Sequence, residues 1–346
     1  MGFWQVDTDT LANGRFVVSP LAETFACLQT LYRNTAAHPA EQSWLATHRP
    51  AYRAMIAADP LTGPLLDAAS GMRTHWIADL LTPVPAVETQ PFEQELQRIR
   101  ATPPERARAN LVVSCGAALP TEFLDIDIAG RLADVLAWVW VETVLPDWER
   151  RRRIIEADIV ARTARLSRSG WAAALNEMRP GMRWLGDGRL QINVHDFPPK
   201  TISGRLLLVP VTPARGWVAW DDGPDFAIVY PCSGALADVG ATALPAPLAR
   251  LLGRNRALIL LLLDAPKSTT QLVALTDQPL GSVGRHLRIL LDAALVRRRR
   301  AGRSVLYYRT AGGDVLVEGA SRAEASRAES STAESAKAAG EPPHIP

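Results

Sequence analysis

The tryptophans of this 346-residue chain are confined to one part of it. All 10 precede residue 221, and the segment after residue 245 is instead strongly basic. Residues 245–310 contain 12 Arg or Lys and 3 Asp, a formal charge of +9, so the rest of a chain with net charge +2 carries −7. Large aromatic side chains fill apolar cores, whereas clustered cations favour a polyanionic partner. The sequence therefore predicts two regions of different kinds.

The composition is that of a globular protein, with 47% hydrophobic and 21% charged residues. A chain of this length can bury a sizeable core and is expected to divide into two or three domains. The N-terminus lacks the basic and apolar regions of a signal peptide, and no apolar run reaches the roughly 20 residues that span a bilayer. We therefore expect a cytoplasmic protein without membrane contact.

The first 180 residues carry apolar side chains at helical spacing. Ser19-Pro20 is a typical helix start, because Ser caps free N–H groups and Pro tolerates the first helical position. Further helices are predicted at about 39–58, 72–81, 91–101, 104–116, 128–145 and 147–178. The segments RLQINVHDF, GRLLLVPV, GWVAWDD and FAIVYP then predict three or four antiparallel strands, since they are short, rich in β-branched or aromatic residues and separated by turn signals.

These patterns predict an α+β fold that is mainly α with small β elements. We expect a large N-terminal domain over residues 1–235, helical to about 180 and β-rich from 187 to 232. A linker at 236–247 and a small domain at 248–316 follow. The tail at 319–346 has almost no large apolar residues, so it cannot offset its ordering entropy by burial and is predicted to be disordered.

The small domain combines two short helices with a basic hairpin. Ser268-Thr269-Thr270-Gln271 fits the capping box of a helix start, and a second helix is predicted from about Pro279 to Ala294 after a tight turn. Strands at 296–300 and 305–310, turning at 301–303, complete the pattern. The apolar face of the second helix contains Val283, Leu287, Leu290 and Ala294, and the opposite face contains Gly281, Ser282, Arg285, Arg288 and Asp292, with His286 at the margin.

This order of elements predicts a winged helix-turn-helix, in which the second helix enters the major groove of DNA. Arg can bind guanine through two hydrogen bonds, Ser and His can bind bases or phosphate, and arginines on the wing suit phosphates or the minor groove. The predicted DNA contacts are Thr269, Thr270, Ser282, Arg285, His286, Arg288, Arg297, Arg298, Arg299, Arg300 and Arg303.

The segment STTQLVALTDQPLGSVGRHLRILLDAALVRRRRAGRSVLYYRT resembles the winged helix-turn-helix of ArsR/SmtB-type transcriptional regulators. The family's S-x-x-x-H-L-x-x-L core stands here as Ser282, His286, Leu287 and Leu290. The segments RFVVSPLAETFACLQTL, GRLLLVPV and IVYPCSG resemble, more loosely, an uncharacterised actinobacterial domain fused to such winged helices. The resemblance implies a homodimeric transcription factor, usually a repressor relieved by an effector, that lies on the nucleoid when bound to DNA. Two helix-turn-helix copies related by a two-fold axis predict a pseudo-palindromic operator in double-stranded DNA.

The second helix departs from the family pattern at its start. Pro279-Leu280-Gly281 replaces the common Ser-Pro-Gly, which removes a capping hydroxyl worth about 1 kcal/mol. Gly284 inside the helix costs about 1 kcal/mol relative to Ala. These departures support an alternative, in which the winged helix is a protein-interaction or dimerisation module without DNA binding. The basic wing argues against it, because a protein-docking face favours apolar or aromatic anchors.

No motif indicates an enzyme, a metal site or a cofactor. Metal-sensing relatives carry Cys pairs on the helix matching 268–275, where this chain has TTQLVALT, and His38, His48 and His75 lack ligand spacing. The adjacent His195 and Asp196 point to opposite faces of an extended segment. Cys27, Cys115 and Cys232 are too far apart for a thiolate motif and are predicted to be free, buried thiols. Whether the tryptophans line an effector pocket, cover a dimer surface or only fill cores stays open.

Overall fold

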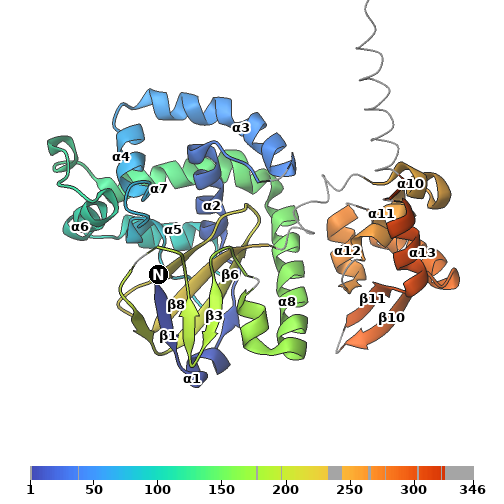
Figure 1. The fold of residues 1–346 in the computed structure, drawn as a ribbon. Helices are drawn as coiled ribbons and strands as arrows, with labels where there is room; N and C mark the ends of the chain where they lie inside the picture. Colours follow the sequence, from blue (N-terminus) through green and yellow to red (C-terminus); the bar gives the residue numbers. More distant parts are fainter. Residues whose placement is uncertain are drawn as a thin grey trace, which may run out of the picture. The chain divides into compact units, whose positions relative to one another are not determined.

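The computed structural model describes residues 2–37, 39–176, 178–195, 197–232, 244–263, 266–276, 278–301, 304–320 and 322–323. The chain forms two compact units, Met1–Gly240 and Ala241–Pro346. Helices and strands occur in both (Figure 1), as the prediction of an α+β fold requires. Most of the predicted linker and of the predicted disordered tail lies outside the described residues. Within these ranges, no helix is long and apolar enough to cross a membrane.

Most helices of the N-terminal unit agree with the predicted ones, but the short helix at Thr8–Ala12 was not predicted and the region of residues 60 to 80 differs. The helices of this unit are α1 (Thr8–Ala12), α2 (Pro20–Arg33), α3 (Pro39–Ala58), α4 (Thr62–Ala69), α5 (Phe92–Arg100), α6 (Pro104–Cys115), α7 (Ile128–Val139) and α8 (Trp148–Asn176). Ser19 caps α2 as expected, since its hydroxyl accepts a hydrogen bond from the Ala22 amide at 3.0 Å. The long helix predicted at 147–178 is interrupted at Gly170, whose φ of 73° and ψ of 176° are not helical.

The helix predicted at 72–81 is wrong. Only Asp79–Leu81 forms a short 3-10 turn, and the helix of this region is α4, which the sequence analysis missed. Gly71 has φ 69° and is followed by a tight turn, in which the His75 amide donates to the Gly71 carbonyl at 2.8 Å and His75 itself has φ 61°. A side chain at Gly71 would meet the Trp76 carbonyl oxygen at 2.4 Å, so the close approach of two backbone segments replaces the helix here.

The strands of the N-terminal unit form two four-stranded sheets. The first has the order β3 (Arg183–Gly186), β4 (Arg189–Gln191), β1 (Phe3–Val6) and β5 (Lys200–Ile202). The second has the order β2 (Arg15–Phe16), β6 (Arg205–Val211), β8 (Asp225–Pro231) and β7 (Trp217–Trp220). Figure 1 shows α2 to α7 gathered on one side of the strands, with α8 running beside them. The N-terminal strands β1 and β2 were not predicted from the sequence. Each pairs with strands that lie some 180 residues later in the chain.

The second sheet is buried on both faces. Leu207 and Val209 of β6 belong to the core formed with the helices, whereas Leu206 and Leu208 of the same strand pack in the core formed with the first sheet. The expectation of purely antiparallel strands is corrected here: β6 pairs parallel to β8, and β7 pairs antiparallel to β8. Runs such as LLLV suit this position, because strands covered on both faces are apolar throughout and are typical of parallel pairing.

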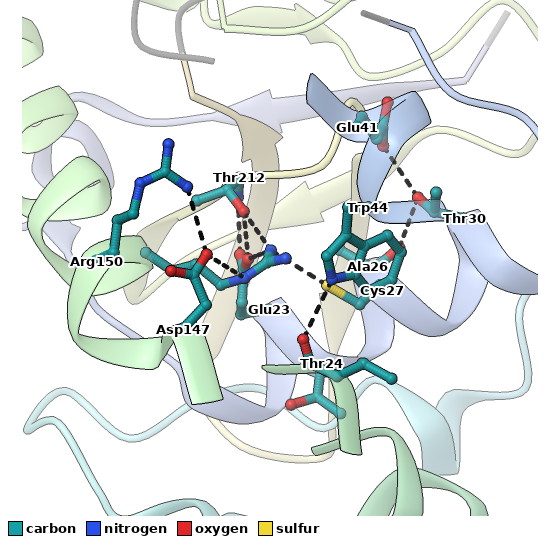
Figure 2. Close-up of polar contacts among 12 residues, drawn as sticks. Glu23, Thr24, Ala26, Cys27, Thr30, Glu41, Trp44, Asp147, Arg150 and Thr212 are labelled. Atoms are coloured by element: carbon teal, nitrogen blue, oxygen red, sulfur yellow. Dashed lines mark hydrogen bonds and ion pairs between the residues drawn. The ribbon is translucent and has the colours of Figure 1, made fainter. Parts of the chain in front are cut away.

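A buried ionic network ties α8 to α2 and to the end of β6, and Figure 2 shows Glu23, Cys27 and Thr212 close together within it. The Arg151 guanidinium donates to Glu23 and to the Thr212 hydroxyl, each at 2.7 Å, and to the Cys27 sulfur at 3.4 Å. The Thr212 amide donates to the same carboxylate at 2.7 Å. The Glu23 side chain is 0% exposed and that of Arg151 9%, so each charge depends on the other for compensation.

All three cysteines are free thiols, as predicted. Cys27 and Cys232 are buried, and burial raises the pKa of both, which keeps them protonated. Cys115 is only partly buried, which corrects the expectation for that residue.

The C-terminal unit is a small helical domain closed by a three-stranded sheet. Its helices are α10 (Ala246–Leu252), α11 (Arg254–Leu262), α12 (Thr269–Thr276) and α13 (Leu280–Asp292), and residues 311–320 are also helical. The sheet has the order β10 (Val296–Ala301), β11 (Ser304–Arg309) and β9 (Lys267–Ser268). Ala257, Ile259 and Leu260 of α11 are fully buried, as expected for the central helix of a small domain.

Candidate nucleic-acid interface

The start of α12 is set by the predicted capping box. The Ser268 amide donates to Gln271 Oε1 at 2.6 Å, and the Gln271 amide donates to Ser268 Oγ at 3.2 Å. Ser268 also pairs with Leu306 of β11, so the same residue anchors the helix and the base of the hairpin. Thr269, the first residue of α12, is partly exposed, while the Thr270 side chain lies outside the described part of the structure.

The predicted division of α13 into two faces is present. Val283, Leu287 and Leu290 are 0%, 1% and 1% exposed and pack inward. On the other side, Arg285 and Arg288 are exposed, and Ser282 and His286 are partly exposed. The helix starts at Leu280 after Pro279, and no side chain caps it, as the missing Ser implies. Helical period therefore identified which of these side chains pack inward and which are accessible to solvent.

The end of α13 differs from the prediction. Ala294 does not belong to the packed face; it follows the helix, is exposed and has φ 53°. The Ala294 amide donates to the Leu291 carbonyl at 2.9 Å and the Leu295 amide to the Leu290 carbonyl at 3.0 Å. This pair of bonds is a Schellman motif, which ends a helix by one residue in the left-handed conformation and is usually made with Gly.

Ser282 and His286 lie one turn apart on the polar face of α13. Ser282 Oγ is 3.5 Å from His286 Nε2, and His286 Nδ1 is buried with no hydrogen-bond partner among the described residues. Burial lowers the pKa of His286, and the positive charges of Arg256 and Arg285 lower it further. The imidazole is therefore neutral at pH 7, where it offers hydrogen bonds but no charge to a nucleic acid.

The hairpin β10–β11 presents its arginines on both faces. In the antiparallel register Arg297 pairs with Tyr308 and Arg299 with Leu306, so these two arginines share one face, while Arg298 and Arg300 share the other. All four arginines are exposed. None has an ion-pair partner in the described part of the chain, so their charge is available to another molecule. The remaining predicted contact, Arg303, lies outside the described residues.

Two other arginines of the basic segment have different roles. Arg309 is ion-paired with Asp314 at 2.7 Å and donates to the carbonyls of Leu260 and Leu261 at the end of α11, which makes it structural. Arg256 lies on α11, where its charge acts on His286 across the fold. The sequence analysis did not place Arg256 at the site, because the 30 residues that separate it from His286 carry no local signal.

Comparisons with known proteins bear on this unit. Residues 254–298 match the family model described as bacterial regulatory protein, arsR family. No curated protein and no solved structure matches the chain. The matched range contains α11, α12 and α13 and enters β10, so it covers the helices and the first strand of the wing. The C-terminal unit is therefore a winged helix-turn-helix of the ArsR family of bacterial regulatory proteins, the kind of domain that marks a DNA-binding transcription regulator.

Proposed function

We propose that this protein is a sequence-specific transcriptional regulator, acting as a homodimeric repressor on a pseudo-palindromic operator. The observation that carries the proposal is the set of exposed arginines on α13 and on β10, for which the described part of the chain provides no ion-pair partner. Arginines that serve only the fold are bonded to carboxylates or carbonyls, as Arg309 is. Exposed guanidinium groups on α13 and on the adjacent strand β10 suit the phosphates and base edges of DNA.

Each part of the interface has a separate task in this proposal. Arg285 and Arg288 on the exposed face of α13 contact base edges in the major groove, with Ser282 and the neutral His286 as hydrogen-bonding neighbours. The arginines of the wing contact phosphates and set the position of the helix without reading sequence. Thr269 and Thr270 at the start of α12 contact the backbone next to the groove.

The N-terminal unit supplies regulation in this proposal. It holds a cavity of about 630 Å³, which lies within the range of small-molecule sites. A ligand in that cavity relieves repression if it binds the DNA-free state more tightly than the DNA-bound state, because only differential affinity shifts such an equilibrium. The two-fold symmetry of the dimer matches the symmetry of the operator.

The test is a fluorescence-anisotropy titration of the full chain against the duplex upstream of its own gene and a scrambled duplex, at about 50 and 200 mM salt. We expect preference for the upstream duplex and a steep loss of affinity with salt, since each neutralised phosphate contributes about 0.9 to the log–log slope. Equal binding to both duplexes would contradict sequence-specific recognition at this site. No binding at low salt would favour the alternative of a protein-interaction module.

A further inference from the structure

The cavity of the N-terminal unit has aromatic walls that are held in place by one another. Its walls come from the turn after α4, the segment between β4 and β5, and β7. Trp76 packs edge to face against Phe197 at 5.5 Å and against Trp220 at 5.3 Å between ring centroids. His75 stacks on His195 at 3.8 Å with an interplanar angle of 11°. Flat rings at fixed angles around a volume of about 630 Å³ suit a planar, apolar ligand.

One charged group on the cavity wall has no hydrogen-bond or ion-pair partner among the described residues. The Nη1 atom of Arg179 is buried and makes no hydrogen bond, and the guanidinium forms no ion pair with any described residue. Burial alone lowers its pKa to about 10, so the group is still a cation at neutral pH. The contrast with Arg151 and Arg162 is direct, because these buried arginines are bonded to Glu23 and Asp158. A buried guanidinium nitrogen that no described residue bonds is costly and requires an explanation, which an anionic ligand at the partly exposed Arg179 would provide.

The charges around Arg179 favour an anion as well. The other charged side chains among the described lining residues are Arg33, Lys200 and Asp79. The Asp79 carboxylate already accepts a hydrogen bond from the Trp76 indole N–H at 3.0 Å. Lys200 places its ammonium 4.9 Å from the centroid of the Trp220 ring, so a positive charge lies directly beside the aromatic wall. Cations therefore outnumber carboxylates at the described surface of the cavity.

We propose that this cavity binds a planar aromatic carboxylate, with the carboxylate bonded to the Arg179 guanidinium and the ring system held among Trp76, Phe197 and Trp220. This inference deepens the proposed function, since it names the chemical class of the effector. A planar carboxylate matches the fork of donors on a guanidinium, and the ring replaces water against apolar walls. Met72 and Val194, which are 50% and 65% exposed, provide further apolar surface at the cavity.

The experiment is isothermal titration calorimetry of the full chain without DNA, using benzoate, 2-naphthoate and anthracene-9-carboxylate, each paired with its neutral carboxamide. We expect at least one acid to bind with 1:1 stoichiometry and at least tenfold more tightly than its carboxamide, because the amide retains the ring and loses the charge. Equal affinity for acid and amide, or no binding of any of the three acids, would overturn the proposal.

Variants assign the binding to the cavity. Arg179→Gln should weaken the acid at least tenfold, to the affinity of the amide, and leave the amide unchanged. Trp220→Leu should weaken acid and amide alike, since it removes a wall and not the charge. The control Arg183→Gln changes an exposed arginine of β3 that does not line the cavity, and both affinities should persist. A preference for the acid that survives Arg179→Gln would contradict the assignment of the carboxylate site.

The folding of Arg179→Gln is itself informative. Removing a guanidinium whose buried nitrogen no described residue bonds should leave the Tm unchanged or raise it, whereas removing a structural cation would lower it. The titration without DNA also separates the two proposals. If the protein binds the acid but not DNA, the proposed regulator function is wrong and the cavity assignment is supported. If it binds DNA but none of the acids, the regulator function is supported and the cavity assignment is wrong.

Discussion

The buried arginines of the N-terminal unit and the wing arginines of the C-terminal unit use their charge in opposite ways. In the N-terminal unit, Arg151 and Arg162 are buried and bonded to carboxylates, so their charge serves the fold. On the wing of the C-terminal unit, Arg297 to Arg300 are all exposed and have no ion-pair partner in the part of the chain that the structure describes. An exposed cation has little desolvation cost and contributes little to stability. The difference in burial and pairing distinguishes arginines that stabilise the fold from arginines whose charge is accessible to another molecule.

Arg179 belongs to neither group, and that makes it informative. It lies in the unit where Arg151 and Arg162 are buried and paired, yet it is partly exposed and its buried Nη1 atom has no hydrogen-bond partner among the described residues. The presence of a carboxylate partner, and not burial alone, thus distinguishes a structural arginine from one that can bind a ligand.

The largest effect is expected from breaking the buried pair. Arg151→Met leaves the Glu23 carboxylate buried without its cation and should lower the free energy of unfolding by about 3–5 kcal/mol. Urea unfolding followed by Trp fluorescence measures the free energy of unfolding of the N-terminal unit, since all 10 tryptophans precede residue 221. The matched control is Arg152→Met. That residue is 46% exposed and pairs only with exposed carboxylates, so its loss should be below about 1 kcal/mol. Equal losses would contradict the distinction.

A second, smaller effect is expected from the pH dependence of the N-terminal unit. Glu95 is buried and accepts bonds from the Leu21 amide at 2.8 Å and from Ser19, and burial raises its pKa from 4.5 to about 7. Between these values the unfolded chain has lost the proton that the folded chain retains, so stability falls as pH rises from 4.5 to about 7. The loss is at most about 3 kcal/mol. Glu95→Gln should remove this slope from unfolding curves measured across that range; a slope that persists would assign it to other groups.

A third prediction concerns base recognition. Arg285→Ala should cost about 1–3 kcal/mol of affinity for the upstream duplex and little for the scrambled one, since a base contact carries sequence preference. Thermal stability should remain within about 0.5 kcal/mol, because Arg285 is exposed and has no ion-pair partner in the described ranges.

Arg299→Ala on the wing is the matched comparison for Arg285. It should weaken both duplexes alike and reduce the salt slope by about 1, because a phosphate contact carries charge and no sequence information. If both variants showed the same uniform loss, the placement of the reading face on α13 would be wrong.

The smallest effect is expected at Gly284, inside α13. A methyl group there would meet no atom within 4 Å, so Gly284→Ala should stabilise the helix by about 1 kcal/mol. Slower hydrogen exchange of the α13 amides, by about fivefold, would measure this. Gly253→Ala is the opposing control, because its φ of 80° suits Gly and the variant should be destabilised by about 1–2 kcal/mol. Faster exchange in Gly284→Ala would show that the glycine is required by the fold.

Local patterns were sufficient where the physics is local. The apolar face of α13, the capping box of α12 and the Ser19 cap of α2 each depend on residues within one or two turns, and each is present. The prediction of a helix at 72–81 was wrong. The apolar residues there do have helical spacing, but the chain forms a tight turn after Gly71 instead. Strand β1 was missed because four residues carry little periodicity and its partner β4 lies far along the chain.

The sequence by itself determined the winged helix-turn-helix and the apolar and polar faces of α13, because capping and helical period are encoded by neighbours. Only the tertiary structure decided the parallel pairing of β6 with β8, the stacking of His75 on His195 and the burial of the Arg179 Nη1 atom without a hydrogen-bond partner among the described residues. Each of these depends on which distant segments meet. A side chain's partners, and therefore its charge balance and its capacity to bind a ligand, exist only once the chain has folded.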